Sequence, residues 1–225
     1  MSRRTGRPSY LVAPPARQHR KRTWIVATAA AAVLVAAPAG GLVGHAVGRP
    51  DPTEASVAKM RQADAERDAQ QVVELTEMAH RTGEELAPII RAVRQDAEAG
   101  RTPERAQVDQ WQQTMRRLVA QFADPPSGMT ATNVARGGLR SAVDQAAVAV
   151  DSVALALGGP SAGRAERMQL AARQATLAVT TWSVAATQLD QVNIDAGQGH
   201  QHVHLDVGEV EGALGPDGSA EGAGG

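Results

Sequence analysis

The sequence predicts an all-α protein, in which an up-down bundle of about four helices follows one N-terminal hydrophobic segment. Apolar residues recur at three- and four-residue steps along four long stretches. Clusters of glycine and proline separate these stretches by short turns. A Gly-rich, acidic tail without Lys or Arg follows them and is expected to be flexible and solvated, apart from one segment around residues 199–208.

The hydrophobic segment covers residues 24–47 and contains no charged side chain. As a helix rising about 1.5 Å per residue it would extend roughly 36 Å, which is enough to cross a bilayer. Residues 1–23 carry seven basic side chains and no acidic one. By the positive-inside rule we expect residues 1–23 in the cytoplasm and residues 48–225 outside, in a single-pass protein of the cell membrane.

A cleaved signal peptide is the alternative interpretation of this segment. Residues 37–39 form an Ala-Pro-Ala site of the small-x-small type, and Pro38 with the Gly40-Gly41 pair weakens a continuous helix. In that case the protein is secreted. Both interpretations export the same domain.

After a linker at residues 48–53, the predicted bundle occupies residues 54–192. Its first helix spans about residues 53–99, and its polar early part is expected to project as a stalk. Pro88 should kink this helix or divide it near Leu86. The residues that share its apolar face are Val72, Leu75, Ala79, Leu86, Ile90 and Val93.

The second helix is expected over about residues 103–123. Gly100 ends the first helix, Thr102 is the predicted N-cap, and Pro103 occupies the first helical position. Its apolar residues have heptad-like spacing, and we expect the two aromatic ones to anchor the core: Val108, Trp111, Met115, Leu118 and Phe122.

The third and fourth helices are expected over about residues 132–157 and 162–192. Gly137-Gly138 should weaken the third helix unless a neighbouring backbone approaches closely there. The predicted core residues of the third helix are Leu139, Val143, Ala146, Val150, Val153 and Leu157. Those of the fourth helix are Met168, Ala172, Ala175, Val179, Trp182, Ala186 and Leu189.

Composition excludes several classes of function. Beyond residue 48 the chain has 16 basic groups against all 24 acidic ones, which argues against a nucleic-acid partner. The absence of cysteine excludes disulfides and thiolate chemistry. Residues 48–225 show no second long apolar run, so a sensor would need a partner to pass a signal inward.

A histidine cluster in the tail, residues 193–225, is the most specific chemical feature. In an extended segment, His200, His202, His204 and Asp206 share one face, while Val203 and its apolar neighbours share the other. Imidazoles on one face can bind Zn²⁺, Cu²⁺ or Ni²⁺. However, same-face neighbours lie about 6.5–7 Å apart, so the strand must bend to chelate one ion. The simpler interpretations are a short strand that packs its apolar face on the bundle, or a disordered tail that is rich in histidine.

Other patterns indicate structure rather than chemistry. Glu77 and His80 form one Glu-x-x-His element, but a di-iron bundle needs two. A hydroxyl stripe on the fourth helix is expected to bond the carbonyls of preceding turns, and its members are Thr176, Thr180, Ser183 and Thr187. No nucleophile-base pair or phosphate loop is present, so we expect no enzyme and no required cofactor.

The sequence therefore predicts a non-enzymatic interaction or scaffold protein of the cell envelope. Its partner is expected to be an envelope protein, and the heptad seams also allow copies of the chain to pair. The alternative is an extracytoplasmic metal-binding protein that uses His200, His202 and His204.

Overall fold

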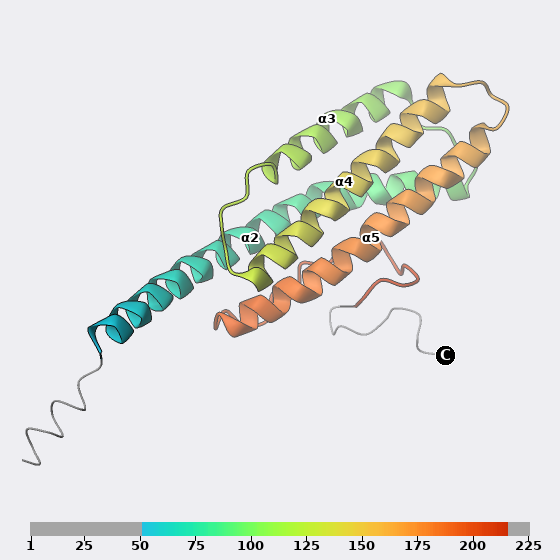
Figure 1. The fold of residues 1–225 in the computed structure, drawn as a ribbon. Coiled ribbons are helices and arrows are strands. Elements are labelled where there is room, and N and C mark those ends of the chain that lie inside the picture. Colours follow the sequence, from blue (N-terminus) through green and yellow to red (C-terminus); the bar gives the residue numbers. More distant parts are fainter. Residues whose placement is uncertain (1–50, 216–225) are drawn as a thin grey trace, which may run out of the picture. The chain divides into compact units, whose positions relative to one another are not determined.

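The computed structural model describes residues 51–215, which contain four helices and no strand (Figure 1). The helices are α2 (Pro52–Glu98), α3 (Arg105–Gln121), α4 (Thr130–Gly158) and α5 (Arg164–Asp195). This confirms the all-α prediction and the existence of its four helices. The chain divides into two compact units, residues 1–58 and 59–225, and the second unit contains every contact described below. The hydrophobic segment lies outside the described residues.

The longest helices of the second unit lie side by side in alternating directions (Figure 1). Thr181 of α5 donates a hydrogen bond to Gln145 of α4 at 3.1 Å. Further along α4, Ser152 donates to Gln174, which comes earlier in α5, at 2.6 Å. The two helices are therefore antiparallel in a fixed register. Hydrogen bonds between α2 and α5 show that these two helices are also antiparallel, as expected of an up-down bundle.

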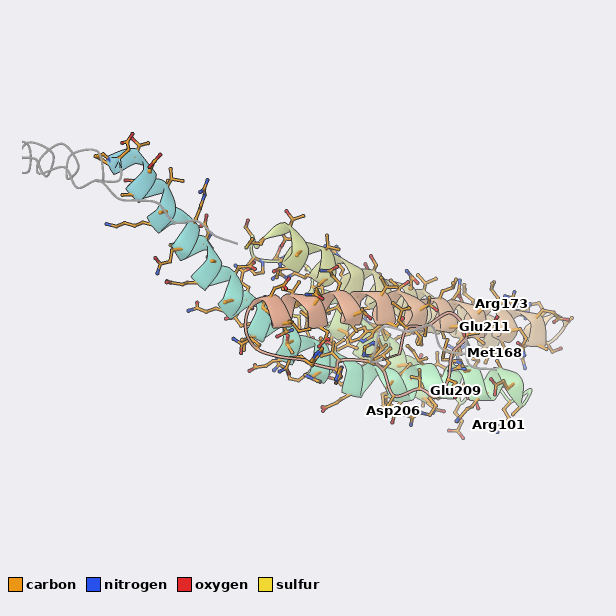
Figure 2. The ribbon with its side chains drawn as sticks, turned by 90° about the horizontal axis from the view of Figure 1, so that it is seen from below. Arg101, Met168, Arg173, Asp206, Glu209 and Glu211 are labelled. Carbon is orange, nitrogen blue, oxygen red and sulfur yellow. The ribbon has the colours of Figure 1, made fainter. Side chains whose placement is uncertain are left out.

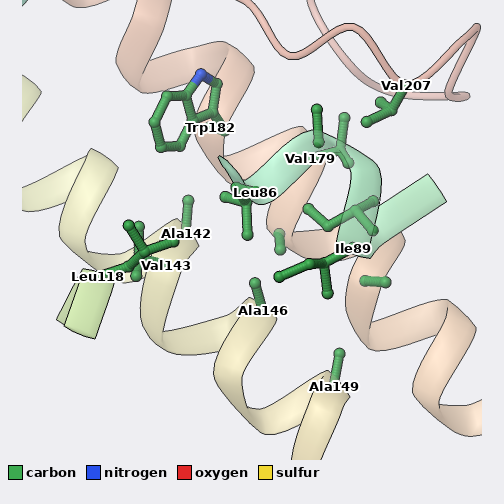
Figure 3. Close-up of a cluster of buried hydrophobic side chains, with 14 of the residues drawn as sticks. Leu86, Ile89, Leu118, Ala142, Val143, Ala146, Ala149, Val179, Trp182 and Val207 are labelled. Carbon is green, nitrogen blue, oxygen red and sulfur yellow. The ribbon is translucent and has the colours of Figure 1, made fainter. Parts of the chain in front are cut away.

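One hydrophobic core draws residues from all four helices. The predicted core positions are confirmed as buried, except that Leu157 and Ala172 are half-buried at its edge. Trp182 is fully buried and Trp111 is 8% exposed, which confirms them as core anchors. Figure 3 shows Leu86 of α2 packed between α4 and α5. Many contacts come from alanines, so the helices approach closely.

Helix α2 continues through Pro88, so the predicted division near Leu86 is wrong. Pro88 itself is exposed, but its neighbours Ala87 and Ile89 are both buried. Packing on either side of the proline therefore holds the helix together despite one lost backbone hydrogen bond. The predicted stalk agrees with the structure over residues 59–67, which are all exposed.

The turn after α2 has the predicted glycine. Gly100 adopts a φ of 61°, and the Arg101 N–H donates to the Asp96 carbonyl at 2.8 Å, as in a Schellman motif. Helix α3 starts two residues later than predicted, because the chain stays extended as far as Glu104. Pro103 is buried before the helix, so the predicted Thr102 cap is wrong.

A buried polar network fixes the connection between α3 and α4. Asp68 of α2 accepts hydrogen bonds from the Met129 N–H at 2.7 Å and from the Thr132 hydroxyl at 2.8 Å. Arg136 is also buried beside it, and burial lowers the pKa of Arg136 although the charges of Asp68 and Glu74 oppose this effect. A carboxylate of α2 thus accepts one backbone N–H and one hydroxyl at the start of α4.

The two glycines of α4 have different surroundings. A Cβ on Gly138 would lie 2.7 Å from the Cβ of Ala185 on α5, whereas a Cβ on Gly137 would meet nothing within 4 Å. Gly138 therefore confirms the expected close approach of a neighbouring helix, and Gly137 does not share this role.

Helix α4 also has the length and apolar composition of a membrane span, by those criteria alone, and it is the one such helix among residues 51–215. The expectation that residues 48–225 hold no second long apolar run is therefore wrong. The composition has a physical source in the fold, because α4 combines a buried core face with several apolar side chains on its outer face.

Candidate functional site

The C-terminal segment, residues 198–215, returns along the bundle and packs against α2 and α5 (Figures 1 and 2). Its buried side chains belong to the same core as the helices, and they are Val203, Val207, Val210 and Ala213. Figure 3 shows Val207 near Val179 of α5. The predicted solvation of the tail is therefore wrong for Val210 and Ala213, helix α5 extends to Asp195 into the predicted tail, and residues 216–225 lie outside the described residues.

Side chains of the helices hold this segment by its backbone. Trp182 donates its indole N–H to the Val203 carbonyl at 2.6 Å, and Arg94 donates to the Val207 carbonyl at 3.0 Å. These bonds replace the partners that a β-strand would have, because no strand is present in residues 51–215. The segment is thus fixed in place without pairing to a sheet.

Asp190 of α5 anchors the start of the segment. Its carboxylate lies 2.9 Å from His200 Nδ1 and also accepts the Gln201 N–H. Burial by itself would raise the pKa of Asp190. The hydrogen bonds from His200 and Gln201, with the positive charge of His200 and His202, outweigh burial and lower the pKa.

The predicted metal-ligand residues are held apart in three environments. His200 and His202 are exposed and stack with ring centroids 5.7 Å apart. His204 is half-buried, and Asp206 is exposed with its carboxylate 3.6 Å from Arg91. No group of three or more potential ligands is close enough to hold a metal ion in residues 51–215. Metal binding by this cluster therefore stays a prediction that requires rearrangement.

A pocket of about 430 Å³ lies between α2 and the C-terminal segment. His80, Glu84 and Arg91 of α2 line it together with His204 and Asp206. Sequence reasoning missed this combination because the two sides are more than 100 residues apart. The four-residue spacing of His80 and Glu84 placed them on one face, but nothing indicated which segment covers that face.

The Glu-x-x-His element and the hydroxyl stripe have the structural roles expected for them. The carboxylate of Glu77 lies 3.6 Å from Arg81 in an exposed ion pair. Thr180 donates to the Thr176 carbonyl at 3.2 Å, and Ser183 donates to the Thr180 carbonyl at 2.8 Å.

A row of exposed apolar side chains runs along the outside of α4 and α5, and we call it the outer stripe. Its members are Val134, Val148 and Leu155 of α4 and Leu170, Leu177 and Val184 of α5. On α5 they recur every seven residues, and on α4 at multiples of seven. A seven-residue step drifts by only about 20° on a helix, so each set stays on one face. Between 46% and 71% of each residue is exposed.

The outer stripe borders two surface hollows between α4 and α5. One of about 310 Å³ is lined by Val148 and Leu177, and a larger one of about 700 Å³ includes Val134 and Val184. The larger hollow is also lined by Gly138 and Ala185, where α4 and α5 approach closely. Large apolar side chains that gather on one face, rather than being scattered singly, are typical of a surface that another molecule covers.

No family model matches the chain, and the curated proteins and the solved structures give no significant match. The geometry of the described residues is therefore the basis for a functional proposal.

Proposed function

We propose that this protein is a non-enzymatic interaction protein of the cell envelope, which its N-terminal segment tethers to the membrane or exports. Its partner is a helical surface that covers the outer stripe. One observation carries the proposal: six large apolar side chains at heptad spacing stay exposed along α4 and α5.

The chemistry of this surface favours a helical partner over a small ligand. The smaller hollow combines Val148 and Leu177 with Gln145, Gln174 and one acid. A small-molecule site is normally a concave cavity with a few convergent polar groups. A shallow apolar row with amides beside it instead matches the groove that accepts an amphipathic helix.

Site-specific photo-crosslinking tests this function in cells that express the full chain. A photoreactive amino acid at Leu177, in the outer stripe, is expected to capture a protein. The same group at Gln113, an exposed position on α3, serves as the matched control and should capture none. Adducts with lipid alone, or no adduct at Leu177, would contradict the proposal.

The chain itself offers a clean test of topology because it has no cysteine. Ser161→Cys lies in the exposed turn between α4 and α5, and Ser9→Cys lies in the basic N-terminal region. In intact cells that express the full chain, a membrane-impermeant maleimide should label the variant at position 161 and not the one at position 9. Labelling of neither variant until the cells are lysed would place the domain in the cytoplasm and reject the envelope assignment.

A further inference from the structure

We propose that the partner on the outer stripe is a second copy of this chain, related by a two-fold axis parallel to α4 and α5. This inference rests on the proposed function, since it names the occupant of the same surface. A two-fold dimer uses one patch twice, so the patch must be complementary to itself. The register of α4 and α5 and the charges beside the outer stripe meet this requirement, and the direction of α2 selects the axis.

The register of α4 and α5 aligns their apolar residues. The bonds from Thr181 to Gln145 and from Ser152 to Gln174 place Val148 level with Leu177. The same register places Leu155 level with Leu170, whereas Val134 and Val184 have no stripe residue at their level. A two-fold axis parallel to the helices preserves these levels and turns α4 of one copy toward α5 of the other. Val148 thus meets Leu177 of the partner subunit.

Opposite charges flank the outer stripe at one level. Asp151 lies on the side of α4 that faces α3, where its carboxylate accepts a hydrogen bond from Gln112 at 2.7 Å. Arg173 of α5 is exposed and four residues before Leu177, and because its neighbour Gln174 faces α4, helical geometry places Arg173 on the other flank of the stripe. The proposed axis brings Arg173 of each copy next to Asp151 of the partner subunit. The pair forms twice, and exposed charges of this kind favour the correct register.

Chain direction selects this axis over the other face-to-face arrangement. An axis parallel to the helices leaves α2 running the same way in both copies, so Lys59 lies at the same end of the dimer in both chains. An axis perpendicular to the helices would place the Lys59 residues of the two copies at opposite ends. If the N-terminal segment is retained as a membrane anchor, the parallel axis suits two copies tethered to one membrane, and the perpendicular axis does not.

Disulfide trapping of the full chain in membranes tests this geometry. One tagged copy carries Val148→Cys, and a second copy with a different tag carries Leu177→Cys. The parent sequence contributes no other cysteine. Mild oxidation should give more of the mixed 148–177 dimer than of either homotypic dimer. Gln113→Cys on α3 is the matched control and should give no dimer.

A charge exchange tests the register independently. Arg173→Glu should reduce the mixed dimer by about two- to fivefold, since an exposed ion pair contributes little, and Arg173→Glu with Asp151→Arg should restore it. Leu177→Glu, added to the copy with Val148→Cys, places a charge against the apolar residue 148 of the second copy. It should therefore abolish the disulfide between position 148 of the first copy and position 177 of the second. Circular dichroism melting checks that these exposed substitutions leave the fold intact.

The outcomes separate this inference from the proposed function. If the photoreactive group at Leu177 captures a different protein and cysteine pairs give no mixed dimer, the interaction function stands and the second-copy inference fails. If Leu177 captures no protein at all, both fail. Dominant 148–148 trapping, or no effect of the charge exchange, would overturn the proposed axis.

Discussion

The two apolar sides of α5 differ in whether another part of the chain covers them. On the side toward α2, the C-terminal segment covers the helix and buries Val203 and Val207. On the side toward α4, the outer stripe stays exposed, with Leu177 60% accessible. The covered side carries polar groups aimed at a particular backbone, namely the Trp182 indole and the Asp190 carboxylate. The open side combines the apolar rows with amide, hydroxyl and carboxylate side chains that no described segment of the chain covers.

This difference indicates two kinds of recognition. A segment without secondary structure needs its buried backbone groups satisfied one by one, so the helices below it supply matched donors and acceptors. A helical partner satisfies its own backbone, so the surface that receives it needs only shape and apolar area. The C-terminal segment of the chain thus covers the first side, and we infer that a helix of another molecule covers the second side.

The largest expected effect is on the covered side. Trp182→Ala removes a fully buried ring and the donor to Val203, so we expect a loss of about 3–5 kcal/mol in the free energy of unfolding. Urea denaturation of the full chain in detergent measures it. Trp182→Phe retains most of the packing and loses the hydrogen bond, so it should cost clearly less. Equal losses for both variants would show that the indole donor, rather than packing, dominates.

The open side is tested through its paired glycines. Gly138→Ala places a Cβ 2.7 Å from that of Ala185, so forcing the helices apart should cost about 1–3 kcal/mol in unfolding free energy. Gly137→Ala meets nothing and should instead gain up to about 1 kcal/mol from helix propensity. Thermal melts of the two variants therefore shift in opposite directions. Two stabilising changes would mean that α4 and α5 do not pack as closely as described.

A smaller effect is expected from pH, again on the covered side. The pKa of Asp190 is lowered in the folded protein, so its stabilising contribution is present above the unfolded value of about 3.9 and is lost as pH falls through the folded value. The stability difference between the parent and Asp190→Asn should therefore be larger at pH 5 than at pH 3. Urea unfolding at the two pH values measures it. A constant difference would argue that Asp190 acts without its charge.

The smallest effect is expected from metal ions. Asp190 holds His200, and the other predicted ligands point to different surroundings, so Zn²⁺, Cu²⁺ and Ni²⁺ should bind weakly to the parent. Calorimetric titration beside the variant His200→Ala/His202→Ala/His204→Ala measures this. Stoichiometric micromolar binding that the variant loses would show that the segment rearranges around a metal, and would support the metal-binding alternative.

Much of the fold could be predicted because its signals are local. Spacing such as that of Leu75, Leu86 and Val93 defines the buried face of a helix without reference to any partner. Gly100 likewise marks a helix end through its own backbone conformation. Starts of helices were predicted less well, as at Thr102, because the burial of Pro103 depends on distant residues.

The candidate sites were predicted less completely. The histidine segment was identified from its composition, and its apolar face is buried as expected, but its ligand geometry depends on Asp190 and on α2. The outer stripe was not separated from the core pattern, because Leu177 and Val179 both have helical spacing in the sequence. Only packing shows that one of them is covered and the other exposed.

The sequence by itself determined the helical class, the four helices, the buried faces and the glycine that ends α2, since each depends on residues within a few turns of one another. The tertiary structure decided which apolar face remains open, where the C-terminal segment docks, and how Asp68 of α2 bonds the start of α4. These features join groups some 60 to 115 residues apart, and helical periodicity carries no information about which faces meet.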